Sequence, residues 1–365
     1  MLVVLQLAGG NDGLNTLVPL DGRYHDLRPT IGLADADLVA FPGDHSYGLH
    51  PALAPLVPLL ASGRLTAVEA VGFPHPDRSH FAALDAWWSA TPGAVSETGW
   101  LGRWLDATAS NATSPLRAVS LGGPAPALVG AQERPVVVRA PREFVLRAPK
   151  ALDAARLQGA WLSSAGGDSD LARQMARATA DAAASVAVFE RLRQQSDTDP
   201  STDASADAIT GPIGSALATA AALVKAGEGT RVIQVGVSGF DTHAGEKATH
   251  QRLLTDLASA LVHFQRELVD AHLDDRVLLM TVSEFGRRAK ENGSGGTDHG
   301  KASVQFLLGP SLRAGVHGQA GLADLDDGDL RAQIDVRSLY TIALDWLGGS
   351  PEEVLGRRYD TVGII

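Results

Sequence analysis

Short apolar runs recur along the chain and alternate with stretches of helical periodicity. The runs predicted to be strands cover residues 2–7, 65–71, 118–121, 136–139, 230–237 and 276–282, and helices are predicted over 51–61, 81–90, 215–226 and 251–273. Several of the runs place apolar residues on both faces, which is typical of strands buried on both sides. The alternation therefore predicts an α/β fold in which helices cover both sides of a mainly parallel sheet.

The length of 365 residues is enough for one large α/β domain, and we expect a single domain over residues 1–365. The middle of the chain departs from the alternation, because residues 151–193 are rich in alanine and contain no strand-like run. A polar run near 195–208 follows and is predicted to be a mobile loop. We interpret residues 140–214, approximately, as a helical insertion in the α/β domain.

Composition excludes several classes of function. A net charge of −11 argues against nucleic acid as a partner, and the absence of cysteine excludes disulfides, thiolate metal sites and a cysteine nucleophile. No apolar run is long enough to span a membrane. A strand begins at residue 2 with no basic segment or cleavage site before it, so as written we expect a cytoplasmic protein, or a periplasmic or exported one if a native leader is missing. The oligomeric state is left open.

The most informative segment follows the strand predicted over 276–282. It contains Glu284, Arg287 and Arg288, and then Asp298 and His299 in a glycine-rich loop. Carboxylate and imidazole are ligands for a divalent metal of the zinc type, and paired arginines suit a phosphate or sulfate group. The alternatives are a polar surface turn for Asp298 and His299, and an ion pair between Glu284 and one of the arginines.

Three other predicted strands also end in polar residues. Asn11 and Asp12 follow the first strand in a glycine-rich turn, where Asp12 could instead be a helix cap. Asp241 and His243 follow the strand at 230–237 and would project to the same face of an extended chain, as ligands of one metal or as a capping aspartate beside an exposed histidine. Because ligands collect beyond the carboxyl ends of parallel strands, we expect all these groups at one edge of the sheet.

The fourth strand end carries Arg78, Ser79 and His80, directly before a predicted helix. Ser79 would lie near the helix N-terminus, where backbone N–H groups favour an anion. We weigh two roles for Ser79: a metal-activated nucleophile, with Arg78 and His80 binding substrate or positioning it, or simply the residue that caps the helix.

The segments GGNDGLN, RSHF, GFDTH and SEFGRR…NGSGGTDHG together resemble an uncharacterised bacterial family of sulfatase-like proteins within the alkaline phosphatase superfamily. The resemblance runs through nearly the whole chain and implies an alkaline-phosphatase-like α/β/α sandwich. It further implies that Asp12, Asp298 and His299 hold one metal, that Asp241 and His243 belong to a second, and that Ser79 is the nucleophile. Many members of that family are exported with a twin-arginine leader, which this chain lacks. A late histidine ligand, for which His317 is the candidate, stands in an ordinary turn sequence.

These observations lead to one functional hypothesis, a metal-dependent hydrolase of phosphate or sulfate esters that uses a serine nucleophile. Its cofactor would be a divalent metal, zinc before manganese, magnesium or calcium, and its partner a small anionic ester. Two alternatives are a non-catalytic metal- or ligand-binding scaffold protein with the same fold and a phosphoryl-transferring mutase. The expected catalytic residues are Ser79, His80 and Arg78, the expected substrate contacts are Asn11, Arg287 and Arg288, and the expected metal ligands are Asp12, Asp241, His243, Asp298 and His299.

Overall fold

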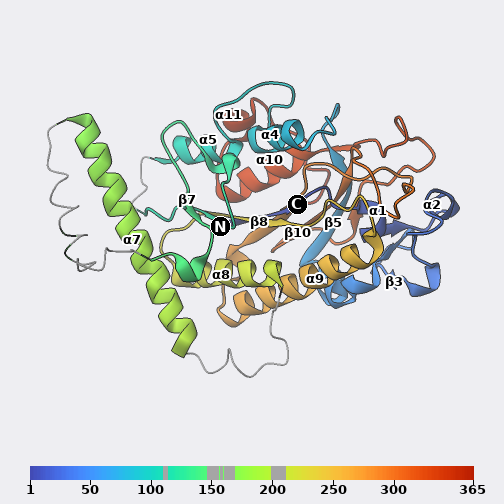
Figure 1. The fold of residues 1–365 in the computed structure, drawn as a ribbon, viewed down its shortest axis with the longest axis horizontal. Coiled ribbons are helices and arrows are strands. Elements are labelled where there is room, and N and C mark those ends of the chain that lie inside the picture. Colours follow the sequence, from blue (N-terminus) through green and yellow to red (C-terminus); the bar gives the residue numbers. More distant parts are fainter. Residues whose placement is uncertain (110–113, 146–155, 157–158, 160–168, 199–210) are drawn as a thin grey trace.

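A computed structural model describes residues 1–109, 114–145, 156, 159, 169–198 and 211–365. Its centre is a nine-stranded sheet in the order β11-β5-β10-β9-β1-β8-β6-β7, with β12 paired to β5 (Figure 1). All paired strands run parallel except β10, which is antiparallel to both neighbours. The bounds are β1 (Leu2–Ala8), β5 (Leu65–Gly72), β6 (Ala118–Leu121), β7 (Val136–Val138), β8 (Val232–Ser238), β9 (Leu278–Val282), β10 (Ser303–Leu308), β11 (Val316–His317) and β12 (Ile334–Asp335).

Helices cover both faces of this sheet, as the alternation predicted. One face carries α8 and α9, and the other carries α4, α5, α10 and α11 (Figure 1). Alternate residues of β1 serve the two layers: Val3 and Leu5 belong to the core under α8 and α9, whereas Leu2 and Val4 belong to the core under α4, α5 and α10. The bounds are α4 (His80–Ser89), α5 (Trp100–Ala107), α8 (Pro212–Ala226), α9 (Glu246–Asp270), α10 (Val336–Leu347) and α11 (Pro351–Leu355).

Local sequence signals set the ends of these helices. In α8, Pro212 occupies the first turn, where a missing N–H costs nothing, and Gly227 ends the helix with a left-handed φ of 65°. The predicted strands and helices all occur within a few residues of their expected ends. Among the longer elements, the prediction missed β10, α5 and α10, and it also missed several short ones.

Smaller elements connect the main strands and helices. A second sheet has the order β2-β4-β3. The bounds are β2 (Leu17–Pro19), β3 (Val39–Ala40), β4 (Tyr47–Leu49), α1 (Gly13–Thr16), α2 (Gly22–Leu27), α3 (Val57–Ala61), and the 3₁₀ helices η1 (Asp35–Asp37), η2 (Pro51–Leu56), η4 (Pro126–Leu128), η5 (Pro141–Glu143) and η7 (Asp274–Arg276).

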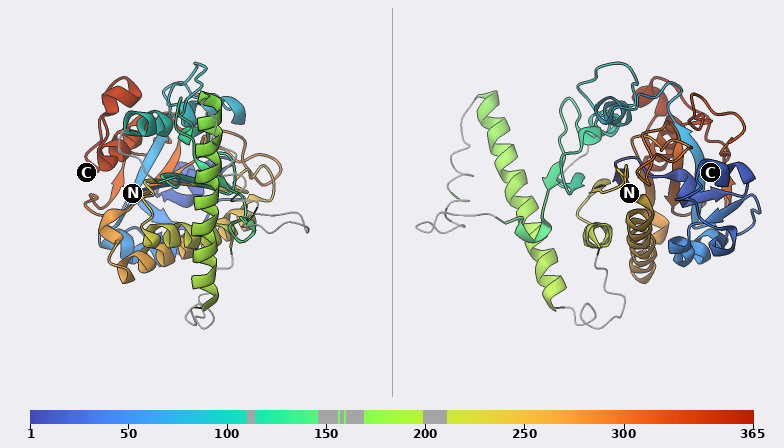
Figure 2. Two further views of the ribbon diagram at one scale, coloured as in Figure 1. Left: turned by 90° about the vertical axis from the view of Figure 1, so that its left-hand side faces the viewer. Right: turned by 45° about the vertical axis from the view of Figure 1, so that its right-hand side comes forward.

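Part of the expected helical insertion is a single long helix, α7 (Asp170–Thr198), which stands beside the β7 edge of the sheet (Figure 2). Only its C-terminal half packs against the body, through Val188 and through Phe189, whose ring lies 5.1 Å from that of Phe144. Of the loop expected near 195–208, residues 195–198 form the end of α7, and the rest lies outside the described residues. No helix in the described part of the chain is both long enough and apolar enough to cross a bilayer.

Candidate metal centre

The four strand ends singled out in the sequence do lie at one edge of the sheet. Strands β5, β9, β1 and β8 run in the same direction, so the loops that follow them leave the sheet together. The close approach of two of these loops depends on Gly9, which has a φ of 123°. A Cβ atom there would lie 2.2 Å from the backbone nitrogen of Asp241. Phe240, fully buried beside it, anchors the β8 loop through its N–H to the carbonyl of Ala8.

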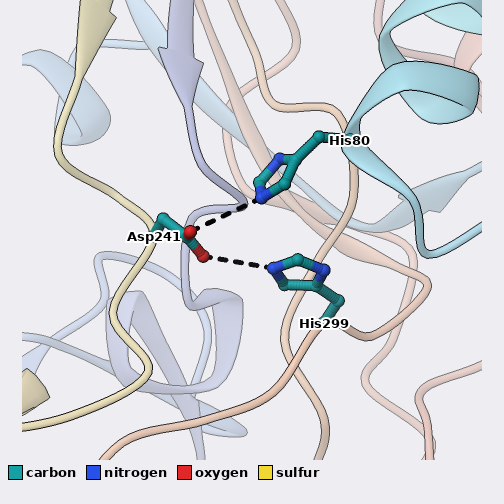
Figure 3. A group of neighbouring side chains, drawn as sticks. All are labelled: His80, Asp241 and His299. Atoms are coloured by element: carbon teal, nitrogen blue, oxygen red, sulfur yellow. Dashed lines mark hydrogen bonds and ion pairs between the residues drawn. The ribbon is translucent and has the colours of Figure 1, made fainter.

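His80, Asp241 and His299 converge from three of these loops (Figure 3). The Nε2 atom of His299 lies 3.1 Å from Asp241 Oδ1, and the Nε2 atom of His80 lies 3.5 Å from Asp241 Oδ2. Ligand atoms of the three residues lie within 4.8 Å of one another, which is the spacing of groups around one metal ion. His80 was predicted as a catalytic residue, and the structure places it among the candidate ligands instead.

The other ring nitrogen of each histidine has an acceptor as its partner. His299 Nδ1 lies 2.9 Å from the carbonyl oxygen of Arg78, and His80 Nδ1 lies 2.9 Å from Glu284 Oε1. A carbonyl oxygen can only accept, so His299 Nδ1 carries the proton; an ionised Glu284 requires the same of His80. In the neutral rings both Nε2 lone pairs therefore face the Asp241 carboxylate. Two acceptors that face a carboxylate are stabilised by a positive charge between them, either a proton on Nε2 or a metal ion. Orientation of the rings by outer partners is typical of metal-bound histidines.

His243 and Asp298 lie beside this trio. His243 Nε2 is 2.9 Å from His299 Nε2 and 3.1 Å from Asp241 Oδ1, and its Nδ1 is 3.3 Å from Asp298 Oδ1. Asn292 donates a hydrogen bond to Asp298 Oδ1 and holds that carboxylate in place. The predicted ligands Asp241, His243, Asp298 and His299 are thus brought together.

Asp241 remains ionised across the physiological range. Burial raises the pKa of its carboxyl, but the hydrogen bond and the positive charge of Arg287 outweigh that effect and lower the pKa to about 2. The Asp241 carboxylate is therefore an anionic ligand at neutral pH.

Asp12 does not join this group. Its carboxylate is fully buried and pairs with both terminal nitrogens of Arg28, and the positive charge of Arg28 overcomes the effect of burial and lowers the Asp12 pKa. Arg28 also donates to the carbonyls of Arg288 and Ala289, so Asp12 anchors the loop that follows β9. The structure thus gives Asp12 an anchoring role, and its role as a metal ligand stays a prediction.

A second buried group, Asp12, Glu246 and His250, also has the spacing of a metal site. Burial and the neighbouring Asp12 charge raise the pKa of Glu246 to about 9, so Glu246 keeps its proton at neutral pH. His250 Nε2 lies 3.0 Å from Asn11 Oδ1, which accepts its proton. Asp12 is paired to Arg28 and His250 to Asn11, so the side chains of this group form a buried hydrogen-bonded network. Asn11, which was predicted to contact substrate, is part of this network through its hydrogen bond with His250.

All three arginines expected at the substrate already have partners. Arg287 is fully buried and donates to Gly10, Thr297 and Phe240 carbonyls and to Asp241, so it braces the loops. Arg78 lies 2.7 Å from Asp327 and 2.9 Å from Asp329, and Arg288 lies 3.5 Å from Asp329. Asp327 and Asp329 lie in a turn later in the chain than the loop that carries Arg288. No local sequence pattern connects that turn to the arginines, so the sequence did not predict these ion pairs.

Ser79 occupies the N-cap position of α4, yet its side chain makes no capping hydrogen bond. It is exposed and stands directly before His80. The simple capping role considered for Ser79 is therefore not supported by its contacts. His317 lies in β11, with Nε2 3.0 Å from the Arg313 carbonyl, and is absent from both candidate metal groups.

Glu284 is buried, and sequence reasoning gave it no firm role. Its Oε1 accepts hydrogen bonds from the Gly9 N–H at 2.8 Å and from His80, and among the described residues it forms no ion pair with Arg287 or Arg288. On its other side lies a small cavity walled by tryptophans, with about 20 Å³ of space. That is room for about one water molecule and too little for an organic substrate.

A family model matches residues 64–360, which is most of the chain. The chain belongs to the DUF1501 family. That family is described as proteins of unknown function. No curated protein matches the chain.

Several solved structures are distantly similar to this DUF1501 chain. Ps i-CgsB has a TM-score of 0.43 at 9% identity, and the match covers 99% of this chain and 75% of that one. The structure of Ps i-CgsB in complex with k-i-k-neocarrahexaose has a TM-score of 0.43 at 11% identity, with the same coverage. The C-terminal periplasmic domain of EcEptC from Escherichia coli has a TM-score of 0.37 at 10% identity, covering 97% and 85%. The membership expected from the motifs, a sulfatase-like family of the alkaline phosphatase superfamily, is wrong: the family shown is DUF1501, and these scores are too low to place the chain in that superfamily.

Proposed function

We propose that this protein is a metal-dependent hydrolase of phosphate or sulfate esters, with one divalent ion held by His80, Asp241 and His299. The observation that carries the metal site is the convergence of two imidazole Nε2 atoms on one ionised carboxylate, with both Nδ1 atoms engaged elsewhere. His243 stands close enough to complete a four-ligand set. Imidazole nitrogens with a carboxylate favour zinc among the common divalent metals.

A bound zinc-type ion would supply Lewis acidity and lower the pKa of a nearby hydroxyl or water. The chain would supply the remaining chemistry. Ser79 is the candidate nucleophile, because its side chain makes no capping hydrogen bond and it directly precedes His80. The N–H groups of the first turn of α4 would favour an anionic group bound beside it. Asp241, Glu284 and the Arg78 carbonyl hold the imidazoles in one orientation.

The first test separates metal binding from turnover. Metal-free protein is titrated with Zn²⁺ in a calorimeter and then assayed on p-nitrophenyl phosphate and p-nitrophenyl sulfate. We expect stoichiometric Zn²⁺ binding, loss of binding in His299→Ala, and in Ser79→Ala the loss of turnover with binding retained. Ser62→Ala, an exposed serine at the end of α3, is the matched control and should behave as wild type. Turnover that persists in Ser79→Ala would remove the nucleophile assignment.

A non-catalytic metal-binding protein is the second candidate, and one observation favours it. The side chains of Arg78, Arg287 and Arg288 are all paired with carboxylates, so none is left facing the centre to bind an anionic substrate. Tight Zn²⁺ binding with no turnover of either ester at millimolar substrate would support this candidate over the hydrolase.

A further inference from the structure

Asp329 is a buried carboxylate that lies between two arginines from different loops. Its side chain is fully buried, Oδ2 is 2.9 Å from Arg78 Nη2, and Oδ1 is 3.5 Å from Arg288 Nε. A tight turn holds it, through reciprocal backbone hydrogen bonds with Asp326. Gly328 within that turn has a φ of 79°, a left-handed backbone conformation that favours glycine.

Both arginines belong to the segments that carry the candidate ligands. Arg78 precedes Ser79 and His80, and its carbonyl oxygen is the acceptor for His299 Nδ1. The Arg288 N–H donates to the Asp298 carbonyl at 2.9 Å, and the backbone of the next residue, Ala289, donates to Gly328 at 3.3 Å. Asp329 therefore lies where the loops after β5 and β9 meet the turn before β12.

Charge explains why this carboxylate should matter to the centre. Without it, the positive charges of the two guanidinium groups would be balanced only by less buried carboxylates, Asp326 and Asp327 beside Arg78 and Asp327 and Asp298 beside Arg288. Arg78 would then turn away and carry its carbonyl with it. His299 would lose the acceptor that keeps the proton on Nδ1, and its Nε2 lone pair would no longer be directed at Asp241.

We propose that Asp329 is a positioning residue for the centre and acts through Arg78 and Arg288 to fix the tautomer and orientation of His299. The proposal rests on the proposed function in one respect only, that the centre binds a metal. Its effect on the ring of His299 is expected in metal-free protein as well.

The test uses the full-length Asp329→Asn variant with ¹⁵N-labelled histidine. The control is Asp324→Asn, because Asp324 is an aspartate that forms an exposed ion pair with Arg331. In metal-free wild type and in the control, NMR should show one His299 tautomer with the proton on Nδ1. Asp329→Asn should give a mixture of tautomers, and its Zn²⁺ affinity, measured by chelator competition, should fall about 10- to 100-fold. A fixed tautomer with unchanged affinity in Asp329→Asn would overturn the proposal.

A second variant covers the case in which Asp329→Asn does not fold. Arg78→Gln removes the link to the carbonyl while leaving Arg288 beside the buried carboxylate, and Arg78 is about one-third exposed, so folding should survive. It should give the same mixture of tautomers, and a fixed tautomer would overturn the proposal. If the wild-type protein binds no Zn²⁺, the proposed function is refuted. The NMR comparison of His299 tautomers in metal-free protein would still decide whether Asp329 positions the ring.

Discussion

At the scale of single residues, the centre depends on partners outside the predicted motifs. Glu284 holds His80 through Nδ1, and the Arg78 carbonyl holds His299 in the same way. A carboxylate in this position fixes the ring and makes its other nitrogen a better ligand. Glu284 thus has a definite place in the site as the partner of His80, with the Gly9 N–H as its second donor.

Glu284→Gln tests that role. The amide keeps the size of the side chain but loses the charge, and one of its two groups becomes a donor, so we expect Zn²⁺ affinity to fall about 10- to 100-fold by chelator competition. Glu97→Gln, at an exposed loop position, should bind Zn²⁺ as wild type does. Equal affinities in the two variants would show that His80 needs no carboxylate partner.

At the scale of elements, the sequence predicted the strands that form the site because each is a short run of mainly apolar residues. It also predicted that their ends would meet, and so brought Asp241, His243, Asp298 and His299 together. It missed β10, whose pairing with β5 and β9 is a long-range property. It did not predict the ion pair between Asp12 and Arg28, because Arg28 lies in a different element and no local spacing signals their pairing.

Glycine in the loop after β9 gives a prediction at this scale. A Cβ atom on Gly286 would lie 1.8 Å from the Ala302 carbonyl oxygen, so Gly286→Ala must push the loop away from the start of β10. We expect the free energy of unfolding, measured with urea, to fall by about 3 kcal/mol. Gly293→Ala, in the same loop with open space around it, should change that free energy by less than about 0.5 kcal/mol. Similar losses in both variants would contradict the packing explanation.

For the molecule as a whole, buried carboxyl groups link stability to pH. Burial raises the pKa of Glu69 to about 8, and both of its oxygens lack a hydrogen-bond partner within the described structure. The unfolded chain ionises this group near pH 4.5, so the folded state holds an extra proton between pH 4.5 and 8. Its contribution to stability is complete below pH 4.5 and is lost as the pH rises towards 8.

Glu69→Gln should remove this dependence. Relative to the variant, the free energy of unfolding of the wild type should decrease by about 1.4 kcal/mol per pH unit between pH 4.5 and 8. Urea titrations of both proteins at pH 5, 6, 7 and 8 measure the difference directly. A difference that does not change with pH would mean that Glu69 is ionised in the folded state.

The reversed direction of β10 has a consequence for how this fold could diversify. Because β9 arrives at the site edge and β10 departs from it, the segment between them starts and finishes at the same rim of the sheet. That segment carries Asp298 and His299, yet residues could be inserted or deleted within it without shifting the pairing of any strand. Related chains could therefore remodel the mouth of the centre through this one loop while they inherit the scaffold unchanged.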